Sequence, residues 1–278
     1  MHHRILLLGL LLSNSALAVD VVAHRGNGCG FHENSVSAIK AAWALGVDGV
    51  EIDLRISSDD VPFLFHDYDY KGLSIGKLRY TEVNRRLGSA APTLDDVLQL
   101  PVAHGYYILD LKERGTEFAL SVAKVAQQSG ISANQLIFQS ENLHDLETIA
   151  GQLSESKFFY LARLRRGSFF RKSPRPDAIV SLLGKYNIDG ISLKGRSYVD
   201  AGFVESIKDA GYLVYVWTIN NSGRASYYRK IGVDGLITDD ALSITRAPDP
   251  GRLNSASCGE SVEPPGNIAG RRNAFSYR

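Results

Sequence analysis

The sequence lacks any strong excess of charge, because 31 Lys and Arg residues stand against 30 Asp and Glu residues and the formal net charge is only +1. A chain so close to neutral carries no global field that would recruit polyanions, and we expect no nucleic-acid partner. Hydrophobic residues make up 44% and charged residues 22% of the 278 positions, which is ordinary for a globular protein with a sizeable core.

Long hydrophobic runs are absent beyond the N-terminus. The first residues, MHHRILLLGLLLSNSALAVD, combine a basic start, a short apolar run and the small-x-small sequence Ala16-Leu17-Ala18. This pattern is typical of a cleaved signal peptide, and the run is far shorter than the ~20 residues that span a bilayer. We therefore expect residues 1–18 to be a signal peptide cleaved after Ala18. The mature chain should be periplasmic or secreted, without a transmembrane anchor.

Cysteine is scarce, with only Cys29 and Cys258 in the chain. No cysteine stands directly after the cleavage signal, which argues against a lipoprotein. An oxidising compartment permits a disulfide between the two cysteines, but the sequence leaves open whether they meet. Residues 247–278 are rich in Pro, Gly, Ser and Asn and show no apolar period, which indicates a flexible C-terminal tail outside the fold.

Between Asp20 and Arg246, short apolar segments alternate with segments of helical periodicity, several of which end in Gly. This alternation over about 220 residues predicts a parallel sheet, with a (β/α)8 TIM barrel of residues 19–246 as the leading architecture. A doubly wound open sheet is the alternative. The expected strands are 20–24, 48–54, 61–66, 106–112, 135–140, 157–162, 189–194, 213–219 and 234–239.

These nine segments exceed by one the strands of an eight-stranded barrel. Only residues 55–60 link the second segment to the third, whereas a parallel crossover needs roughly a dozen residues or more. We therefore expect either a hairpin-like extra strand or an irregular barrel after strand 2.

Chemically active residues gather where the expected strands end. His24 and Arg25 end the first strand, His66 ends the third, and Asp110 and Lys112 end the fourth. The carboxyl ends of barrel strands meet at one mouth, where the active sites of such enzymes lie. We expect these side chains to form one site, with Gly26 leaving room for an anion.

Glu51 and Asp53 are two residues apart on the second strand, so both carboxylates point to the same side. Two carboxylates in an apolar setting repel each other unless a cation is present. Together with Asp110 they suit one hard divalent cation, Ca²⁺ or Mg²⁺. The alternative is a set of structural ion pairs with Arg25 and Lys112.

His24 and His66 are side chains that can accept and donate protons near neutral pH. Each alone would more often be a buried histidine of structural importance, but two beside a predicted cation site suggest a general base and a general acid. The Arg25 guanidinium offers a forked donor for phosphate oxygens. The joint interpretation is cleavage of a phosphodiester.

The ordered motifs HRG…EN, VEIDL, FLFHD, PTLDDVL, ILDLK, VWTINN and GVDGLITDD resemble those of the glycerophosphodiester phosphodiesterases. The resemblance runs from about Val21 to Asp240. It implies a barrel of the phospholipase-C-like phosphodiesterase type, one divalent cation, and hydrolysis of glycerophosphodiesters to sn-glycerol 3-phosphate and an alcohol. The small-molecule diester is the expected partner.

By resemblance, the site residues take the following roles: His24 and His66 are catalytic, Arg25 and Lys112 hold phosphate, Glu51, Asp53 and Asp110 bind metal, and Glu33 and Asn34 give support from behind. The third metal ligand of the family is usually Glu, whereas Asp110 is one methylene shorter. Related sphingomyelinase D enzymes also use Asp there. A phospholipase D- or C-like enzyme acting on intact lipid is therefore the alternative, and an inert exported binding protein on the same barrel is a more remote one.

Two further segments have a functional and a structural interpretation. Trp217 either walls the pocket for the leaving group or packs in the core. Residues 163–176 contain six basic residues and no acidic one, and they could contact anionic components of the cell envelope at the surface. The alternative for 163–176 is a solvated linker.

Overall fold

The structure is a computed structural model that describes residues 18–87, 91–102, 104–162 and 175–246. The predicted signal peptide lies outside this part except for Ala18, and so do the C-terminal tail and residues 163–174 of the basic segment. Cys29 is disulfide-bonded, while Cys258, the second cysteine of the chain, lies outside the described residues. No helix in the described ranges has the length and apolar composition needed to cross a membrane.

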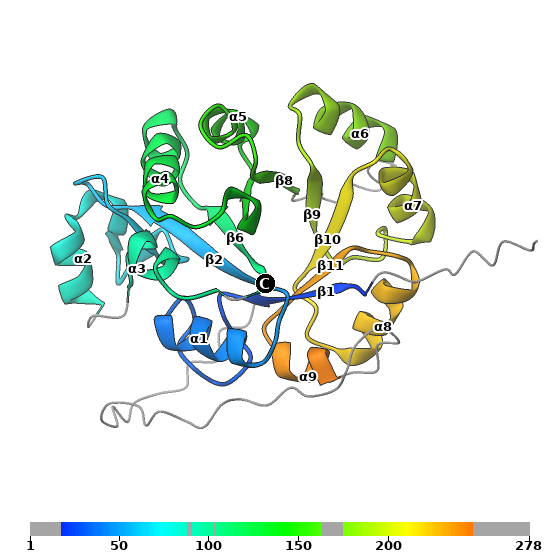
Figure 1. Cartoon of the computed structure of the whole chain (residues 1–278), viewed down its shortest axis with the longest axis horizontal. Coiled ribbons are helices and arrows are strands. Elements are labelled where there is room, and N and C mark those ends of the chain that lie inside the picture. Colours follow the sequence, from blue (N-terminus) through cyan, green and yellow to red (C-terminus); the bar gives the residue numbers. More distant parts are fainter. Residues whose placement is uncertain (1–17, 88–90, 103, 163–174, 247–278) are drawn as a thin grey trace, which may run out of the picture.

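The core of the fold is a closed barrel of eight parallel strands. Parallel pairing runs in the order β1, β11, β10, β9, β8, β7, β6 and β2, and β1 also pairs with β2, which closes the ring (Figure 1). This closure excludes the open doubly wound sheet. The strands are β1 (Asp20–His24), β2 (Gly49–Ile56), β6 (Tyr106–Leu111), β7 (Leu136–Ser140), β8 (Lys157–Ala162), β9 (Gly190–Lys194), β10 (Leu213–Trp217) and β11 (Gly235–Thr238).

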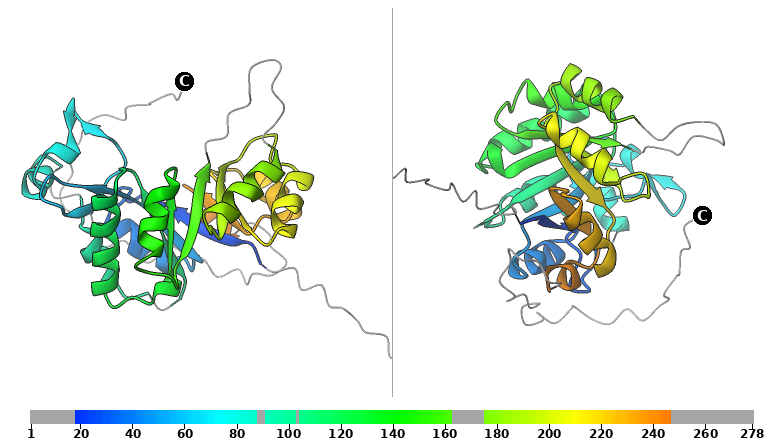
Figure 2. Two further views of the ribbon diagram at one scale, coloured as in Figure 1. Left: turned by 90° about the horizontal axis from the view of Figure 1, so that it is seen from above. Right: turned by 90° about the vertical axis from the view of Figure 1, so that its right-hand side faces the viewer.

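The extra strand predicted after strand 2 is present. β3 (Pro62–Leu64) pairs antiparallel with β2, with Leu54 opposite Leu64, because the short connection allows a hairpin but no crossover. The chain then forms a small excursion that lies at one end of the molecule (cyan in Figure 2). It contains β4 (Asp69–Tyr70), β5 (Leu73–Ser74), the 3₁₀ helix η1 (Ile75–Lys77) and α2 (Tyr80–Arg86).

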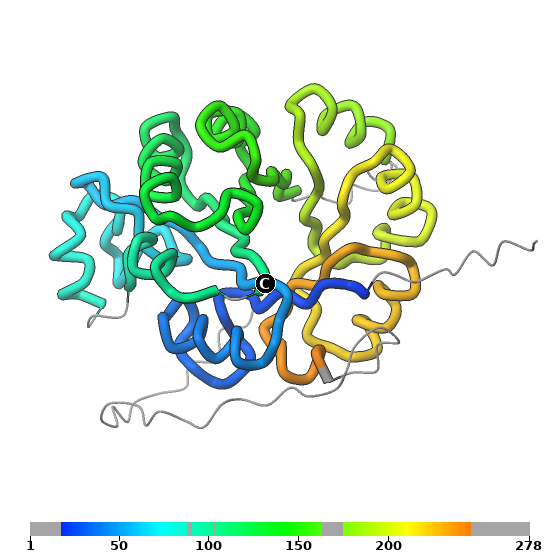
Figure 3. The backbone as a smooth tube through the Cα atoms, in the orientation of Figure 1, coloured from blue at the N-terminus to red at the C-terminus, as the bar shows by residue number. Residues whose placement is uncertain are grey.

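Helices surround the barrel, and the tube in Figure 3 follows the chain from β1 round to β11, which lies beside β1. Several helices begin at side-chain caps that accept a backbone N–H, including Ser35, Thr93, Asn142, Asp200 and Asn221. The helices are α1 (Val36–Ala44), α3 (Leu94–Leu98), α4 (Thr116–Gln128), α5 (Leu143–Ala150), α6 (Pro176–Lys185), α7 (Ala201–Asp209), α8 (Ser222–Lys230) and α9 (Ala241–Arg246), and a 3₁₀ turn, η2 (Ala133–Gln135), precedes β7.

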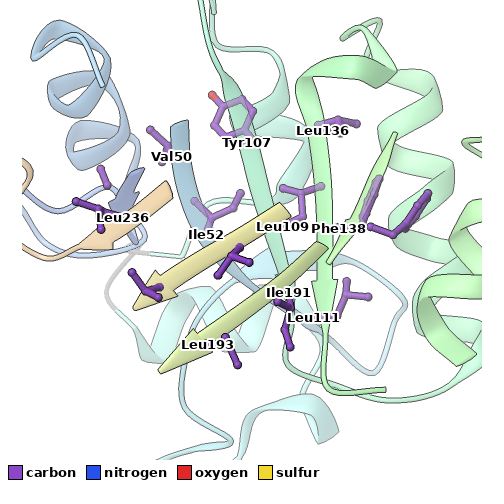
Figure 4. Packing of buried hydrophobic residues seen from close by; sticks show 14 of the residues in the cluster. Val50, Ile52, Tyr107, Leu109, Leu111, Leu136, Phe138, Ile191, Leu193 and Leu236 are labelled. Atoms are coloured by element: carbon purple, nitrogen blue, oxygen red, sulfur yellow. The ribbon is translucent and has the colours of Figure 1, made fainter. Parts of the chain in front are cut away.

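The main hydrophobic core lies between the barrel and the helices. Val50 and Ile52 on β2 and Leu109 on β6 belong to it (Figure 4). A second, smaller cluster contains Val22, Ile108, Ile137, Phe159, Tyr215 and Ile237. Because side chains alternate along a strand, these residues belong to the opposite face, the barrel interior.

Tyrosines gather at the N-terminal end of the barrel interior. The hydroxyls of Tyr106 and Tyr215 both donate to Oδ2 of Asp20 at 2.7 Å. Burial, together with the neighbouring Asp20 carboxylate, raises the pKa of both tyrosines well above the ordinary value, so both remain neutral donors. The opposite end of the barrel interior, at the carboxyl ends of the strands, contains acidic and basic side chains.

Candidate active site at the barrel mouth

A cleft of about 560 Å³ opens where the barrel strands end. It brings together residues from both ends of the chain, as expected for the carboxyl ends of parallel barrel strands. The residues that line it are His24, Arg25, Asn27, Glu33, Glu51, His66, Asp110, Lys112, Gln139, Leu161, Lys194, Trp217, Thr218, Ile237 and Asp239.

The three predicted acidic ligands lie together. Glu51, Asp53 and Asp110 are all buried, and each offers a carboxylate oxygen within 4.8 Å of the others. Strand pairing explains this proximity, since Asp53 lies directly opposite Asp110 in the register of β2 and β6. Glu51 and Asp53 occupy alternate positions on β2, so they share the inward side while Ile52 between them faces the helices.

The acids are charged to different degrees in the metal-free chain. Burial, and then repulsion from Asp53, raises the pKa of Glu51 to about 8. Burial also opposes ionisation of Asp53, but Lys112 and Arg25 outweigh it and hold the pKa of Asp53 well below its usual range. Glu51 is therefore the acid that needs another cation to become a carboxylate near neutral pH.

Two basic side chains hold the acidic cluster together. Nζ of Lys112 lies 2.9 Å from Oδ1 of Asp53 and 2.5 Å from Oδ2 of Asp110. Nε of Arg25 lies 3.0 Å from Oδ2 of Asp53, and the backbone N–H of Arg25 donates to Oε2 of Glu51 at 2.9 Å. The ion pairs with Arg25 and Lys112, considered as the alternative to a metal site, are thus present. They do not satisfy every carboxylate oxygen of the acidic cluster.

The acidic cluster suits a hard divalent cation. All of its donors are carboxylate oxygens, which is the chemistry that Ca²⁺ and Mg²⁺ prefer. Oδ1 of Asp110 is buried and has no hydrogen-bond partner among the described residues. An acceptor in that state is costly unless a ligand satisfies it.

Glu33 and Asn34, in the loop that follows Arg25, hold side chains of the site in position. The Asn34 side chain donates to Oδ2 of Asp53 at 2.8 Å and accepts the backbone N–H of Asp53 at 3.1 Å. Glu33 accepts from Nη1 of Arg25 at 2.8 Å. Asn34 has a left-handed backbone with φ of 54°, a conformation in which asparagine is enriched.

His24 is held between two acids. Its Nδ1 lies 2.5 Å from Oδ1 of Asp239, and its Nε2 lies 3.8 Å from Oε2 of Glu51. The other oxygen of Asp239 accepts from Nδ2 of Asn220 at 2.8 Å. Burial lowers the pKa of His24, but Glu51 and Asp239 outweigh it and the net shift is upward.

His66 lies at the same cleft but in a different electrostatic setting. Its Nδ1 lies 2.8 Å from the exposed carboxylate of Asp67, and its backbone carbonyl accepts from Nη2 of Arg55 at 2.7 Å. Burial lowers the pKa of His66, and Asp53 only partly offsets this. The pKa values of the two histidines are therefore shifted in opposite directions.

The remaining predicted residues have clear surroundings. Trp217 lines the cleft and is half-buried, with the ammonium of Lys194 over its ring at 5.7 Å. Glycine is required at position 26 for a reason other than the expected room for an anion. The φ of Gly26 is +74°, and an added Cβ would lie 2.9 Å from the backbone nitrogen of Ile39 in α1.

The sequence interpretation did not single out Asp239, Asn220, Gln139 or Lys194. The motifs GVDGLITDD and VWTINN contain the first two, and their places after strands were the available signal. Gln139 and Lys194 also lie at the ends of expected strands. A single Gln or Lys at a strand end does not indicate a functional role unless the tertiary structure shows that it lines the cleft. The cleft assembles all ten predicted residues or places them directly behind its walls.

Comparisons with known proteins agree with this arrangement. Residues 24–243 match the model of the Glycerophosphoryl diester phosphodiesterase family. The glycerophosphodiester phosphodiesterase of Caldanaerobacter subterraneus is 22% identical over 243 residues, covering 79% of this chain and 93% of its own length. Glycerophosphodiester phosphodiesterase 1 of Bos taurus is 25% identical over 260 residues, covering 81% and 78%.

Solved structures show the same fold. A phosphodiesterase of Oleispira antarctica, in complex with the product sn-glycerol-3-phosphate, superposes with a TM-score of 0.69 at 23% identity, covering 83% of this chain and 96% of its own. A glycerophosphodiester phosphodiesterase of Thermotoga maritima has a TM-score of 0.65 at 25% identity, covering 80% and 95%. Because the family match spans most of the chain, this protein belongs to the glycerophosphoryl diester phosphodiesterase family and is a phosphoric diester hydrolase.

Proposed function

We propose that the enzyme is a metal-dependent hydrolase of glycerophosphodiesters that releases sn-glycerol 3-phosphate and an alcohol by histidine acid–base catalysis. The single observation that carries the proposal is the convergence of two histidines, Arg25, Lys112 and three carboxylates in one cleft. The product bound to the Oleispira antarctica phosphodiesterase supports the same chemistry.

The basic residues are suited to hold the phosphate. Arg25 and Lys112 both line the cleft and are already oriented by Asp53. Their positive charges would offset the charge that develops on the phosphate oxygens in the transition state. Because Asp53 fixes both cations before substrate arrives, little reorganisation is needed during the reaction.

The acidic cluster would hold one divalent cation, Ca²⁺ or Mg²⁺, through Glu51, Asp53 and Asp110. When bound, such a cation lowers the pKa of a neighbouring hydroxyl and neutralises phosphate charge. Asn34 fixes the orientation of the Asp53 carboxylate for this task.

The two histidines would share the proton transfers. One takes the proton from the glycerol hydroxyl next to the ester, and the hydroxyl oxygen forms a bond to phosphorus. The bond from phosphorus to the leaving oxygen breaks, and the other histidine donates a proton to that oxygen. Water then opens the cyclic phosphate with the two roles reversed. Asp239 and Asp67, on the far nitrogens of His24 and His66, keep the rings oriented.

Release of sn-glycerol 3-phosphate from soluble glycerophosphodiesters tests the proposal. Activity that stops with a chelator and returns with one added cation would support the metal-dependent reaction and identify the ion. His24→Ala and His66→Ala should each abolish turnover without unfolding the protein, and retained activity would refute the assigned roles. If the metal-loaded protein hydrolysed lipid vesicles but no soluble diester, the lipid-directed alternative motivated by Asp110 would replace this one.

Export is a separate part of the proposal. The N-terminal pattern supports a signal peptide cleaved after Ala18, which would place the mature enzyme in the periplasm or outside the cell. Expression of the full chain in a bacterium with the expected export pathway, followed by N-terminal sequencing, tests this. A mature N-terminus at Val19 in the exported fraction is expected, whereas an uncleaved chain in the cytoplasm would refute it.

A further inference from the structure

Lys194 has a different electrostatic situation from the other charged residues of the cleft. It is the last residue of β9, its side chain is exposed, and it lines the cleft opposite the acidic cluster. Arg25, Lys112, His24 and His66 each have a carboxylate partner. Within the described part of the chain, Lys194 has no ion pair, and its ammonium lies over the ring of Trp217.

Two polar groups on other residues that line the cleft also lack partners. Oε1 of Gln139 and Nε1 of Trp217 are buried without a hydrogen bond to any described residue. Gln139 as a whole is only 3% exposed and yet lines the cleft. One is an acceptor and the other a donor, and a ligand hydroxyl group can donate to the first or accept from the second. Gln139 lies beside Asp110 in the register of β6 and β7, whereas Trp217 lies beside Lys194 in the register of β9 and β10. Lys194 and Trp217 are called the polar wall below.

We propose that the polar wall binds the alcohol half of the diester and selects alcohols that carry hydroxyls and negative charge, such as polyol phosphates, over alcohols that carry an ammonium group. This inference rests on the proposed function, since it assigns the substrate class of the same site. The acids and bases on the β1, β2 and β6 side would hold the phosphate. The opposite side of the cleft is then left for the group attached to it.

The position of Lys194 explains why a choline-type alcohol is disfavoured. Proteins that recognise quaternary ammonium groups place them over aromatic rings. Here the Lys194 ammonium already lies 5.7 Å from the centre of the Trp217 ring. A second cation on that surface would meet a like charge, whereas a phosphate would gain an unpaired ammonium and the Trp217 N–H as donors.

The experiment compares kcat/KM for three diesters that share the glycerol half: glycerophosphoinositol 4-phosphate, glycerophosphoinositol and glycerophosphocholine. The wild-type enzyme should have a kcat/KM at least about tenfold higher for the first diester than for the last. One charge–charge interaction with the partly solvent-exposed Lys194 ammonium accounts for a difference of this size. Lys194→Met should remove most of the advantage of the 4-phosphate, and Lys194→Glu should reverse the order. Lys124→Met, on the exposed face of α4, is the matched control and should change none of the three values.

A binding measurement separates this inference from the proposed function. Calorimetry with free inositol 4-phosphate and with choline needs no turnover, and only the first should bind in a manner that depends on Lys194. Equal losses for all three diesters in Lys194→Met would mean that the polar wall holds the common glycerol half, which overturns the inference. An unchanged substrate order in both variants, or binding of inositol 4-phosphate that is independent of Lys194, also overturns it. Failure to hydrolyse any diester, with Lys194-dependent binding intact, would overturn the proposed function alone.

Discussion

Replacement of Lys112 by Met separates the two tasks that the structure assigns to this residue. The Lys112 side chain is only 13% exposed, and its ammonium touches Asp53 and Asp110. Met keeps most of the volume but leaves two buried carboxylates without that partner. Removing one member of a buried ion pair costs about 3–5 kcal/mol. For a domain of this size that corresponds to a fall in melting temperature on the order of 10 °C in the metal-free protein.

The same substitution should strengthen cation binding. The Lys112 ammonium contacts two of the carboxylates that would hold the cation, and such a neighbour would repel it by on the order of 1–2 kcal/mol even at the dielectric constant of water, which is about tenfold in affinity. Without Lys112 this repulsion disappears and the acidic cluster gains one net negative charge. Ca²⁺ or Mg²⁺ should therefore bind Lys112→Met more tightly and recover much of the lost stability, while hydrolysis remains weak because a phosphate ligand is missing.

The assay is thermal unfolding and calorimetric titration of both proteins, with and without the cation. Lys124→Met again serves as control, because replacing an exposed surface lysine should change the free energy of unfolding by no more than about 0.5 kcal/mol. Equal stability of Lys112→Met and wild type without metal, together with unchanged cation affinity, would refute the view that Lys112 neutralises the acidic cluster.

Three other perturbations test neighbouring contacts. Burial and Asp53 raise the pKa of Glu51 from 4.5 to about 8, so protonation of Glu51 stabilises the metal-free fold fully below pH 4.5, and this contribution is lost as the pH rises through 8. Cation binding near neutral pH should therefore release a proton from Glu51. Calorimetry in buffers of different ionisation heat measures this release, and the absence of a released proton would refute the assignment. Asn34→Ala should cost about 1–3 kcal/mol in denaturant unfolding, because Asp53 loses a donor and its N–H loses an acceptor, and a loss below about 0.5 kcal/mol would contradict that role. Asp239→Asn should lower kcat about tenfold to a hundredfold at nearly constant KM by misorienting His24, whereas a change in KM alone would argue for a substrate contact instead.

Much of the fold follows from local pattern. The alternation of apolar strands and helical segments predicted the parallel barrel, and all nine expected strands are present with ends shifted by at most two residues. The short link of residues 55–60 was enough to place the extra strand, since connection length restricts strand direction. The helical periodicity of the sequence did not predict helices α2, α3 and α9. Each is short, so little apolar periodicity marks it.

The electrostatic roles within the site could not be read from the sequence. Glu51 and Asp53 are equivalent in the pattern, but their pKa values move in opposite directions, because only Asp53 lies against both Lys112 and Arg25. Charge interactions depend on distance and burial, which spacing along one strand does not specify. Likewise, the contact between His24 and Asp239 joins positions 215 residues apart.

The sequence by itself determined the strand-end chemistry: a period of two on β2 places Glu51 and Asp53 on one side, and parallel strands direct His24 and Asp110 to the same mouth. Only the tertiary structure decided which of these groups touch and which wall of the cleft lies opposite them. Closure of the barrel places Lys194 on β9 across from Glu51 and Asp53 on β2, whereas Gln139 lies directly beside Asp110 in the register of β6 and β7. That placement depends on the register of eight strands together, and no local segment of the chain contains it.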